Sequence, residues 1–262
     1  MADPLRVYWW NEQPNFGDAM NPLLLERLFG RTVVWASLQE AELTAAGSVI
    51  QWITPVLDAR EQPIAIWGSG YIHGVEPPPP HDAVRFCAVR GRMSIALSAL
   101  PADTVCGDPG ILASLVVPRP QPWRRRIGVV PHLWHRDHPT IRGLAHVDDV
   151  VVIDVSAEPL AVIEQIASCE LVLSTSLHGL VIADSYRIPN RWVTLEPPLF
   201  GGRWKFDDYY SGWARHGDPV PLRATSAADL RALIGDSEHP PEAAGLEAAQ
   251  DRLLAAFPFS AT

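Results

Sequence analysis

Lysine is almost absent from this chain of 262 residues: it occurs once, at Lys205, among 21 lysine and arginine residues. Where a sequence uses arginine nearly everywhere, a surviving lysine suggests that its position needs a compact ammonium group rather than a planar guanidinium. We therefore predict a ligand-binding role for Lys205. The alternative is that this lysine has survived by chance.

Cysteine is also scarce, and Cys87, Cys106 and Cys169 are far apart and lack the spacing of metal ligands. An odd number of separated cysteines does not favour structural disulfides, so we expect all three to pack in the core. No uninterrupted apolar run reaches the roughly 18–20 residues that a membrane helix needs. The first residues, MADPLRVYWW, lack the basic and then apolar layout of a signal peptide. Together these absences predict a cytoplasmic protein.

Positive charge is in deficit, because 21 basic residues face 30 acidic ones and the formal net charge is −9. This balance argues against nucleic acid or an acidic membrane as the main partner. An anionic ligand must therefore be held by a few local cations. The hydrophobic share of 47% is that of a globular protein, and the length suffices for one large domain or two modest ones.

Apolar strand-like runs alternate with helix-like segments along both halves of the chain. In the first half, helix-like segments at 21–29, 39–57 and 91–100 follow strand-like runs, and in the second half such segments lie at 159–169, 177–187 and 226–234. Strands rich in Val and Ile that alternate with helices indicate parallel sheets covered on both faces. We predict an α/β fold of two Rossmann-like domains that face a cleft. The Pro/Arg-rich stretch 117–126 is interpreted as a linker, which gives domains at 1–118 and 119–262, the second ending in a helix.

Ligands of such folds bind beyond the carboxyl ends of the strands, so the loops at these ends are the places to look for chemistry. Asn15, Gly17 and Asp18 follow a strand and precede a helix, whose first amides can meet an anion or a sugar. The alternative is that Asp18 and Asn21 only cap that helix. Arg90 ends another strand and is a candidate for gripping a carboxylate or phosphate, with a solvated surface arginine as the alternative.

Three histidines at spacings of three, His132, His135 and His138, raise the question of a zinc site. Their spacing does not place all three on one helical face, and the HExxH pattern with its general base is missing. We therefore expect no metal. His132 is the best placed of the three for a cleft, because it comes first after a strand.

The segment STSLHG, residues 174–179, lies where a buried strand gives way to a helix. Free amides and the positive end of the helix dipole point from such a junction into the cleft. His178 titrates near neutral pH and is able to donate to a phosphate oxygen or act as a general acid. A hydrogen-bonded core histidine is the alternative.

Later in the chain, Arg203 and Lys205 form a cation pair flanked by aromatic residues. This arrangement suits an anionic ligand, and the alternative is a loop with solvated charges.

In chain order, the segments NFGDAMNP, GSG, VRG, GDPG, PHLWHRD, STSLHGLVIADSYRIPN and KFDDYY resemble the polysaccharide pyruvyl transferases. The resemblance spans roughly Tyr8 to Ser211, and its last two segments are the specific ones. It implies a fold like that of the GT-B glycosyltransferases. It also implies transfer of pyruvate from phosphoenolpyruvate to a sugar of a polysaccharide, as a cyclic ketal, with phosphoenolpyruvate as the donor substrate and no further cofactor.

Carried over to this sequence, the resemblance makes Arg90, His178 and Lys205 contacts of phosphoenolpyruvate, with His178 as the acid. Asp18 becomes the base for the sugar hydroxyls or the residue that positions the sugar, with Asn15 nearby. The remaining residues assigned to substrate binding are Gly17, His132, Ser176, Leu177 and Gly179. Better-studied members can carry arginine at the position of Ser176, and Arg203 is the candidate for supplying that charge. By the same resemblance the first domain receives the acceptor and the second phosphoenolpyruvate.

Two other functions stay open at this point. One is a GT-B glycosyltransferase that uses a nucleotide sugar, although no clear acidic ribose-binding residue is seen in the second half. The other is a non-catalytic carbohydrate-binding relative in a polysaccharide assembly complex. The expected acceptor is an oligosaccharide or polysaccharide, and a lipid-linked acceptor would bring the protein to the inner membrane surface.

Overall fold

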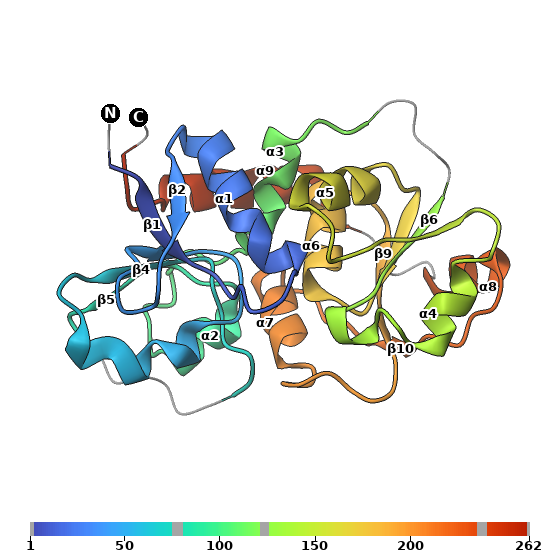
Figure 1. Ribbon diagram of the computed structural model, residues 1–262, viewed down its shortest axis with the longest axis horizontal. Coiled ribbons are helices and arrows are strands. Elements are labelled where there is room, and N and C mark those ends of the chain that lie inside the picture. Colours follow the sequence, from blue (N-terminus) through green and yellow to red (C-terminus); the bar gives the residue numbers. More distant parts are fainter. Residues whose placement is uncertain (1–2, 75–80, 121–125, 235–239, 261–262) are drawn as a thin grey trace.

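The computed structural model of this protein describes residues 3–74, 81–120, 126–234 and 240–260 (Figure 1). The strands are β1 (Leu5–Tyr8), β2 (Val33–Trp35), β3 (Leu43–Thr44), β4 (Ile64–Trp67), β5 (Val84–Ala88), β6 (Ile127–Val130), β7 (Val150–Val152), β8 (Leu171–Ser174), β9 (Asn190–Thr194) and β10 (Val220–Pro221). The α-helices are α1 (Phe16–Phe29), α2 (Arg92–Leu97), α3 (Ala113–Val116), α4 (Pro139–Leu144), α5 (Pro159–Ala167), α6 (Leu177–Ser185), α7 (Trp204–Gly212), α8 (Ala227–Ile234) and α9 (Ala243–Ala255). The 3₁₀ helices are η1 (Ile50–Trp52), η2 (Thr54–Ala59), η3 (Pro109–Leu112) and η4 (Leu133–His135).

The described strands form two five-stranded sheets, and every strand pairs with its neighbours in parallel. The first sheet has the order β2-β1-β3-β4-β5 and the second the order β10-β9-β8-β6-β7. Numbered within its own half, each sheet therefore has the doubly wound order 2-1-3-4-5. The predicted fold class, α/β with two Rossmann-like units, is confirmed. Each sheet reverses its strand order once, between β1 and β3 in the first and between β6 and β8 in the second.

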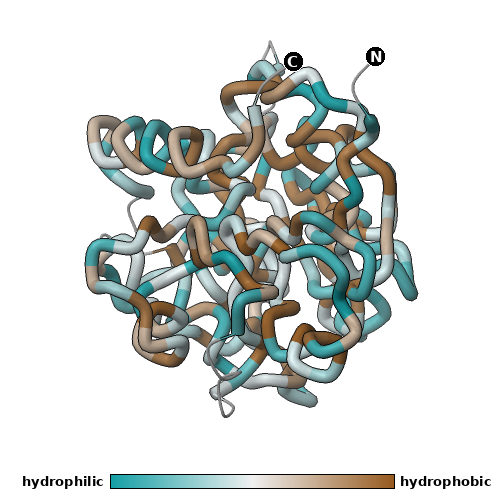
Figure 2. The backbone as a smooth tube through the Cα atoms, turned by 90° about the vertical axis from the view of Figure 1, so that its left-hand side faces the viewer, coloured by the Kyte–Doolittle hydropathy of each residue, from teal (hydrophilic) through white to brown (hydrophobic). Residues whose placement is uncertain are grey.

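The central strands are apolar on both faces because helices cover them on both sides. All four residues of β4, β6 and β8 are buried, and in each strand most of them are Val, Ile, Leu or Trp. This is the pattern expected of parallel strands inside an α/β layer structure. Along the chain, hydrophobic and hydrophilic residues alternate closely rather than separating into long blocks (Figure 2).

The segment 39–57 was expected to be helical, and this prediction is wrong. It contains the short strand β3, followed by η1 and η2. Leu43 and Thr44 are completely buried at the centre of the first sheet, between β1 and β4. Alanine and leucine are good helix formers, but helix propensities differ by less than about 1 kcal/mol per residue, and burial in a sheet overrides such a preference. Gly47, which follows shortly after β3, has a φ of +129°, a backbone conformation that residues other than glycine rarely adopt.

A solvated loop was one of the two interpretations of the region of Arg203 and Lys205, but the chain from Trp204 to Gly212 forms helix α7. This helix is anchored by Asp208, which is completely buried. The Asp208 carboxylate accepts hydrogen bonds from the backbone amide and the hydroxyl of Ser94, at 2.8 and 2.7 Å. A helix of the second half is thereby fixed to helix α2 of the first, and Lys205 lies at its beginning.

The two halves share hydrophobic cores. One cluster joins Leu5 and Val7 of β1 to Leu177 and Leu180 of α6, and another joins residues of α1 to α5 and α6. Figure 1 shows α1 beside α5 and α6, between the two sheets. This shared packing fixes the two halves relative to each other.

The domain boundary between 118 and 119 stays a prediction. Residues 121–125 of the predicted linker lie outside the described residues. Helix α9, which we assigned to the second domain, packs on the first sheet, and Trp67 of β4 donates a hydrogen bond from its indole nitrogen to the carbonyl of Leu253 at 2.8 Å. The chain therefore returns to its first half after completing the second.

The structure also bears on the expectations about membrane helices and cysteines. In the part of the chain that is described, no helix combines the length and the apolar character needed to cross a bilayer. All three cysteines are free thiols, with Cys169 buried and Cys87 and Cys106 half-buried. Burial raises the pKa of the Cys169 thiol to about 12, which makes it unreactive.

Candidate active site

A pocket of about 310 Å³ lies between the two halves. It is lined by Trp10, Glu12, Asn15, Asp18, Ser48, Val49, Trp52, Ile72, His132, Leu133, Trp134, Ser176, Leu177, His178, Phe200 and Lys205. The volume is at the lower end of the range of small-molecule sites. Both halves contribute to the wall, as expected for a cleft between two Rossmann-like units.

The pocket lies at the switch points of both sheets. Its residues follow β1 and β3 in the first half and β6 and β8 in the second, the strands between which each sheet reverses its order. Loops that diverge at such a point leave a crevice at the carboxyl ends of the strands, where ligands bind. Here two crevices open into a single pocket.

Helix α6 begins at the pocket. Ser176 is its N-cap residue, and its hydroxyl makes no capping hydrogen bond. The first amides of the helix are therefore open to an anion, and the helix dipole favours one there. Gly179 allows the tight turn before it, because a Cβ at this position would lie 2.3 Å from Oγ of Ser174. The predicted junction of strand and helix around His178 is confirmed.

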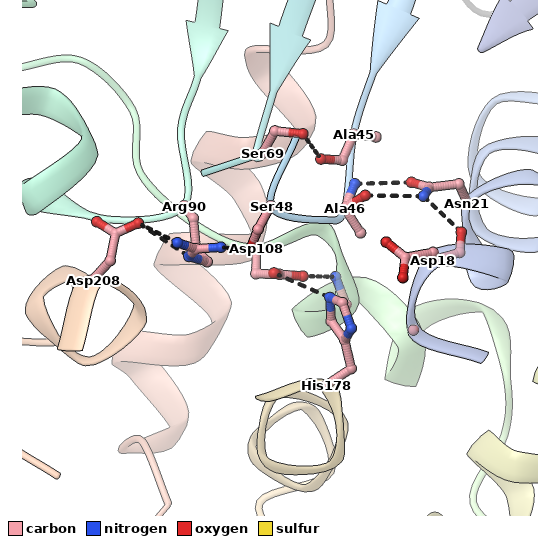
Figure 3. Close-up of polar contacts among 12 residues, drawn as sticks. Asp18, Asn21, Ala45, Ala46, Ser48, Ser69, Arg90, Asp108, His178 and Asp208 are labelled. Carbon is pink, nitrogen blue, oxygen red and sulfur yellow. Dashed lines mark hydrogen bonds and ion pairs between the residues drawn. The ribbon is translucent and has the colours of Figure 1, made fainter. Parts of the chain in front are cut away.

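Helix α1 points its first turn at the same space. The Asn15 side chain caps it by accepting from the amide of Gly17 at 3.4 Å, and it also donates to Asp18 at 2.5 Å. Asp18 therefore does not cap the helix. Asn21 does not either, because its side chain exchanges hydrogen bonds with the backbone of Ala46 at 2.8 and 3.0 Å (Figure 3).

Gly17 of α1 lies against the imidazole ring of His178 in α6. A Cβ at Gly17 would lie only 1.9 Å from Nδ1 of His178 and 2.6 Å from its Cγ. No side chain larger than hydrogen fits there unless the imidazole ring moves. The glycine was assigned to substrate binding, and the structure shows a specific reason for its presence, which is the position of the histidine ring.

His178 lies in the first turn of α6, with 11% of its side chain exposed. Its Nε2 faces Oδ2 of Asp108 at 3.7 Å, as Figure 3 shows. Asp108 comes from the N-cap position of η3, where its other oxygen accepts from the amide of Gly110 at 2.9 Å. The edge of the His178 ring also contacts Phe16, with ring centroids 6.4 Å apart.

Asp18 and Lys205 are the buried charged groups of the pocket wall. Burial raises the pKa of Asp18 to about 6, although the nearby His178 and Lys205 oppose this shift. Burial lowers the pKa of Lys205 to about 8, and Arg90 lowers it further while Asp18 opposes the change. At neutral pH Asp18 is therefore negatively charged and Lys205 positively charged. Each group would become neutral after a pH change of about one unit, Asp18 at lower pH and Lys205 at higher pH.

The burial of Lys205 predicts that removing its charge stabilises the fold. Its pKa of about 8 in the folded chain lies below its ordinary 10.5, so the unfolded chain binds more protons between these values. Stability then rises as the pH increases from about 8 to 10.5, and the full penalty is present below 8. We expect Lys205→Met to raise the free energy of unfolding at pH 7 by about 1–3 kcal/mol, since one pKa unit corresponds to about 1.4 kcal/mol.

Urea unfolding at pH 7 and pH 10.5 measures this effect, and the difference between the two proteins should shrink at the higher pH. Arg203→Met is the matched control, because the Arg203 side chain is 57% exposed and should change stability little. A Lys205→Met protein that is less stable than the wild type at pH 7 would contradict the assignment of a buried, strained charge.

His132 is a neutral imidazole in the pocket wall. Burial lowers its pKa to about 2, and the neighbouring Lys205 acts in the same direction. Its Nδ1 accepts from the backbone amide of Trp134 at 3.3 Å, so the proton of the neutral ring is on Nε2. His132 can therefore donate a hydrogen bond to a ligand without bringing a charge.

Arg90, predicted as an anion clamp, does not line the pocket. Its guanidinium is completely buried and pairs with Asp208 at 3.0 Å. It also donates to the hydroxyl of Ser48 and to the carbonyl of Tyr71, both at 2.6 Å. Burial without water requires every donor to find a partner, and these partners are on the protein. Arg90 thus holds the side chain of Ser48 in the pocket wall. Through Asp208 it also holds helix α7, which carries Lys205.

Arg203 does not line the pocket either. It is mostly exposed and binds the carboxylate of Asp207 through two hydrogen bonds, at 2.6 and 2.9 Å. Its guanidinium also lies 5.7 Å from the ring centre of Trp192. It does not supply the charge that an arginine in place of Ser176 would bring. Among the described residues that line the pocket, Lys205 is the fixed cation.

The three spaced histidines do not converge. The ring centroids of His132 and His135 are 6.3 Å apart, and His135 is held by Thr175 and by the carbonyl of Pro197, at 3.1 and 3.0 Å. His138 caps helix α4 by accepting from Thr140 at 3.1 Å. Within the described ranges, no group of three His, Cys, Asp or Glu residues is placed to hold a metal ion.

The pocket has an aromatic rim, which we define as Trp10, Trp52, Trp134 and Phe200. Trp10 and Trp134 lie in loops that the sequence placed near the cleft, whereas Trp52 and Phe200 were missed. Trp52, Trp134 and Phe200 have exposed fractions of 40, 57 and 59%. Tryptophan is usually buried, and the sequence alone gives no signal of exposure. Ser48 was missed as well, because it lies in the segment that we expected to be helical.

Comparison with known proteins shows which family the middle of the chain resembles. Residues 86–197 match the family described as polysaccharide pyruvyl transferase. This range includes the end of the strand before Arg90, the turn with Asp108 and the start of α6 with His178. This part of the chain is therefore similar to the polysaccharide pyruvyl transferases. The match agrees with the resemblance drawn from the sequence segments, and it supports a transferase that acts in polysaccharide synthesis.

Two curated proteins have similar sequences over most of this chain. It is 28% identical over 222 residues to the uncharacterized protein L143 of Acanthamoeba polyphaga mimivirus, covering 78% of this chain and 73% of that protein. It is 29% identical over 212 residues to the succinoglycan biosynthesis protein ExoV of Rhizobium meliloti (strain 1021), covering 77% of this chain and 62% of ExoV. The alignment therefore spans less than two thirds of ExoV.

Among solved structures, the wall teichoic acid polymerase TagF (H548A) aligns with 98% of this chain and 84% of its own. The TM-score is 0.42 and the sequence identity is 10%. A similarity this low carries no argument about ligands or activity.

Proposed function

We propose that this protein transfers the pyruvyl group of phosphoenolpyruvate to two hydroxyls of a sugar, forming a cyclic ketal and releasing phosphate. The observation that carries the proposal is the meeting of Asp18, His178 and Lys205 at the joint switch point of two parallel sheets. A base, an acid and a fixed cation are the groups that such a transfer requires.

The donor side is the start of α6 with Lys205. Phosphoenolpyruvate carries a phosphate and a carboxylate, and the open amides of α6 suit one of these anions. Lys205 suits the other, since its side chain is buried and lines the pocket. Ser176 adds a hydroxyl donor in place of an arginine. Anion binding in an enclosed site is the largest contribution that this architecture can make to the reaction.

The chemistry divides into two additions at C2 of phosphoenolpyruvate. His178 donates a proton to the methylene carbon C3, and the first sugar hydroxyl attacks C2 as Asp18 accepts the proton of that hydroxyl. The second hydroxyl then attacks C2, the bond from C2 to the phosphate oxygen breaks, and the second proton leaves with the phosphate. The products are the pyruvate ketal and hydrogen phosphate. The charged form of Asp18 at neutral pH fits the base, since its pKa is about 6.

The same two pKa values predict a bell-shaped pH dependence of kcat/KM for phosphoenolpyruvate. Below about pH 6, Asp18 becomes protonated and the base is lost. Above about pH 8, Lys205 loses its proton and the anion site is weakened. The profile of kcat/KM reports the groups of the free enzyme, so the maximum should lie between these values. In Lys205→Arg the alkaline limb should change, because a guanidinium stays protonated and only the acid His178 then limits the rate at high pH. An unchanged alkaline limb would contradict the role of Lys205.

The acceptor side is the aromatic rim. Trp134 and Phe200 project from the second half and Trp52 from the first, with Trp10 beside them in the wall. Exposed aromatic rings around a polar pocket suit the apolar faces of sugar rings. His132 and Trp134 contact each other with centroids 5.3 Å apart, which places a neutral hydrogen-bond donor beside a stacking surface.

Removal of one rim residue should therefore affect the acceptor and not the donor. We expect Trp134→Ala to raise KM for the sugar by about 10-fold, since stacking on an aromatic ring contributes on the order of 1 kcal/mol or more. KM for phosphoenolpyruvate should stay within about 2-fold, because Trp134 lies outside the donor side. Steady-state kinetics with each substrate varied in turn measures both values. Trp35→Ala is the control, because Trp35 on β2 is 44% exposed but does not line the pocket.

Ligand-induced thermal stabilisation tests the proposed donor. Phosphoenolpyruvate should raise Tm in a concentration-dependent way, because a ligand that binds only the folded chain stabilises it. Nucleotide sugars at the same concentrations should not. The reverse result would favour a nucleotide-sugar glycosyltransferase, and stabilisation by oligosaccharides alone would favour a non-catalytic carbohydrate-binding protein.

A further inference from the structure

Two buried polar atoms beside the pocket face each other without a hydrogen bond. They are Oδ2 of Asp108 and Nε2 of His178, and each is enclosed and without a hydrogen-bond partner in the structure. The Asp108 side chain is 1% exposed, and the two atoms are 3.7 Å apart. Buried polar atoms are nearly always paired, so this juxtaposition requires an explanation.

Asp108 cannot turn away to find another partner. Its Oδ1 accepts from the amide of Gly110 at 2.9 Å, and that bond fixes the plane of the carboxylate. On the other side, the His178 ring is held against Gly17 and Phe16. The two rigid groups therefore present one acceptor atom to one nitrogen. If Nε2 of His178 and Oδ2 of Asp108 moved closer by less than 1 Å, they would form a hydrogen bond of ordinary length. Hydrogen bonds between catalytic groups are often long before the ligand binds.

We propose that Asp108 is a positioning residue, whose Oδ2 accepts the proton on Nε2 of His178 and so leaves Nδ1 as the nitrogen that exchanges a proton with the ligand. A carboxylate behind an imidazole fixes the tautomer and the orientation of the ring and stabilises its protonated form. The part of this proposal that concerns proton transfer rests on the proposed function. The part that concerns the tautomer does not.

Other charged or titratable groups also act on His178. Asp18 faces it from α1, Lys205 from α7 and His132 from the loop after β6. Asp108 differs from these three because it approaches Nε2 directly and is not part of the pocket wall. A substitution at Asp108 should therefore change the state of the ring while the groups that face the ligand stay in place.

The test is the tautomer of His178 in the ligand-free protein, read from long-range ¹H–¹⁵N correlation spectra with ¹⁵N-labelled histidine. Loss of one set of signals in His178→Gln assigns the residue among the nine histidines. At alkaline pH, where the ring is neutral, the wild-type proton should be on Nε2. In Asp108→Asn the amide oxygen must still accept from Gly110, so its NH₂ group faces Nε2 and the proton should move to Nδ1.

Asp154→Asn is the matched control, since Asp154 accepts from the amide two residues ahead, as Asp108 does, but lies away from the histidine. It should leave the tautomer unchanged. Turnover provides the second measurement: Asp108→Asn should lower kcat for phosphate release by about 10²-fold or more at nearly unchanged KM, as expected when the wrong tautomer is fixed.

A wild-type His178 with its proton on Nδ1, or an unchanged tautomer in Asp108→Asn, overturns the proposal. The wild-type spectrum alone decides this if the variant does not fold. A protein that shows the expected tautomers but releases no phosphate from phosphoenolpyruvate would refute the proposed function and leave the pairing of Asp108 and His178 standing.

Discussion

Replacement of His178 by alanine is expected to lower kcat for phosphate release from phosphoenolpyruvate by about 10²–10⁴-fold, the contribution of a positioned general acid. His178 is the titratable side chain at the start of α6, where the helix dipole and the open amides place the donor anion. Without it, the methylene carbon of phosphoenolpyruvate has no proton donor in the first turn of that helix. Phosphate release followed over time in the presence of a sugar acceptor measures the loss.

Two further variants separate proton donation from binding and from folding. His178→Gln keeps a hydrogen-bond donor but cannot transfer a proton near neutral pH, so it should bind phosphoenolpyruvate nearly normally and remain inactive. His146→Ala removes an exposed histidine outside the pocket and should behave as the wild type. If His178→Gln turned over at a near-normal rate with unchanged KM, the assignment of His178 as the acid would be wrong.

The second large effect is expected at a residue with no side chain. Gly17→Ala places a Cβ 1.9 Å from Nδ1 of His178, and this contact is with the ring itself rather than with the end of a flexible side chain. The ring must then leave its position, so activity should fall by about 10²-fold or more, as is common when a catalytic group is misplaced by 1 Å. Since alanine is a better helix former than glycine, the substitution lacks an independent reason to disrupt α1.

The double variant shows by which route Gly17→Ala acts. If its effect passes through the ring, adding it to His178→Ala should cost almost nothing more, because a double-mutant cycle reports coupling between the two sites. Gly143→Ala is the matched control, since a Cβ there meets nothing within 4 Å and the residue lies in helix α4. Equal losses in the single and double backgrounds, measured as kcat, would show that Gly17 acts on something other than His178.

The sequence was a good guide to the fold class and to the place of the site. Alternating buried strands and helices predicted two parallel α/β units, and the rule for the carboxyl ends of strands pointed to Asn15, Asp18, His132 and His178, all of which line the pocket. These predictions succeed because they depend on local periodicity and on topology. The segment 39–57 failed because a two-residue strand is held by its neighbours in the sheet and not by its own preferences.

The assignment of charges was less reliable, and Arg90 and Arg203 show why. Both are arginines near the ends of strands or helices, and the sequence does not reveal which carboxylate each will meet. Asp208 is 118 residues from Arg90 in the chain, and Asp207 is four residues from Arg203. Lys205 was distinguished by its rarity, and the structure adds that it is the buried cation of the pocket. The alignment of Asp108 with His178 is not visible in the sequence, because the two residues are brought together only by the fold.

The most direct test of the central claim is phosphate release from phosphoenolpyruvate in the presence of a panel of pyranosides with free 4,6- or 3,4-hydroxyl pairs. The account predicts that at least one acceptor gives phosphate in a one-to-one ratio with a new ketal carbon in the ¹³C spectrum, and that His178→Ala abolishes both. Phosphate release with no ketal, or no reaction with any diol while a nucleotide sugar is consumed, would contradict it.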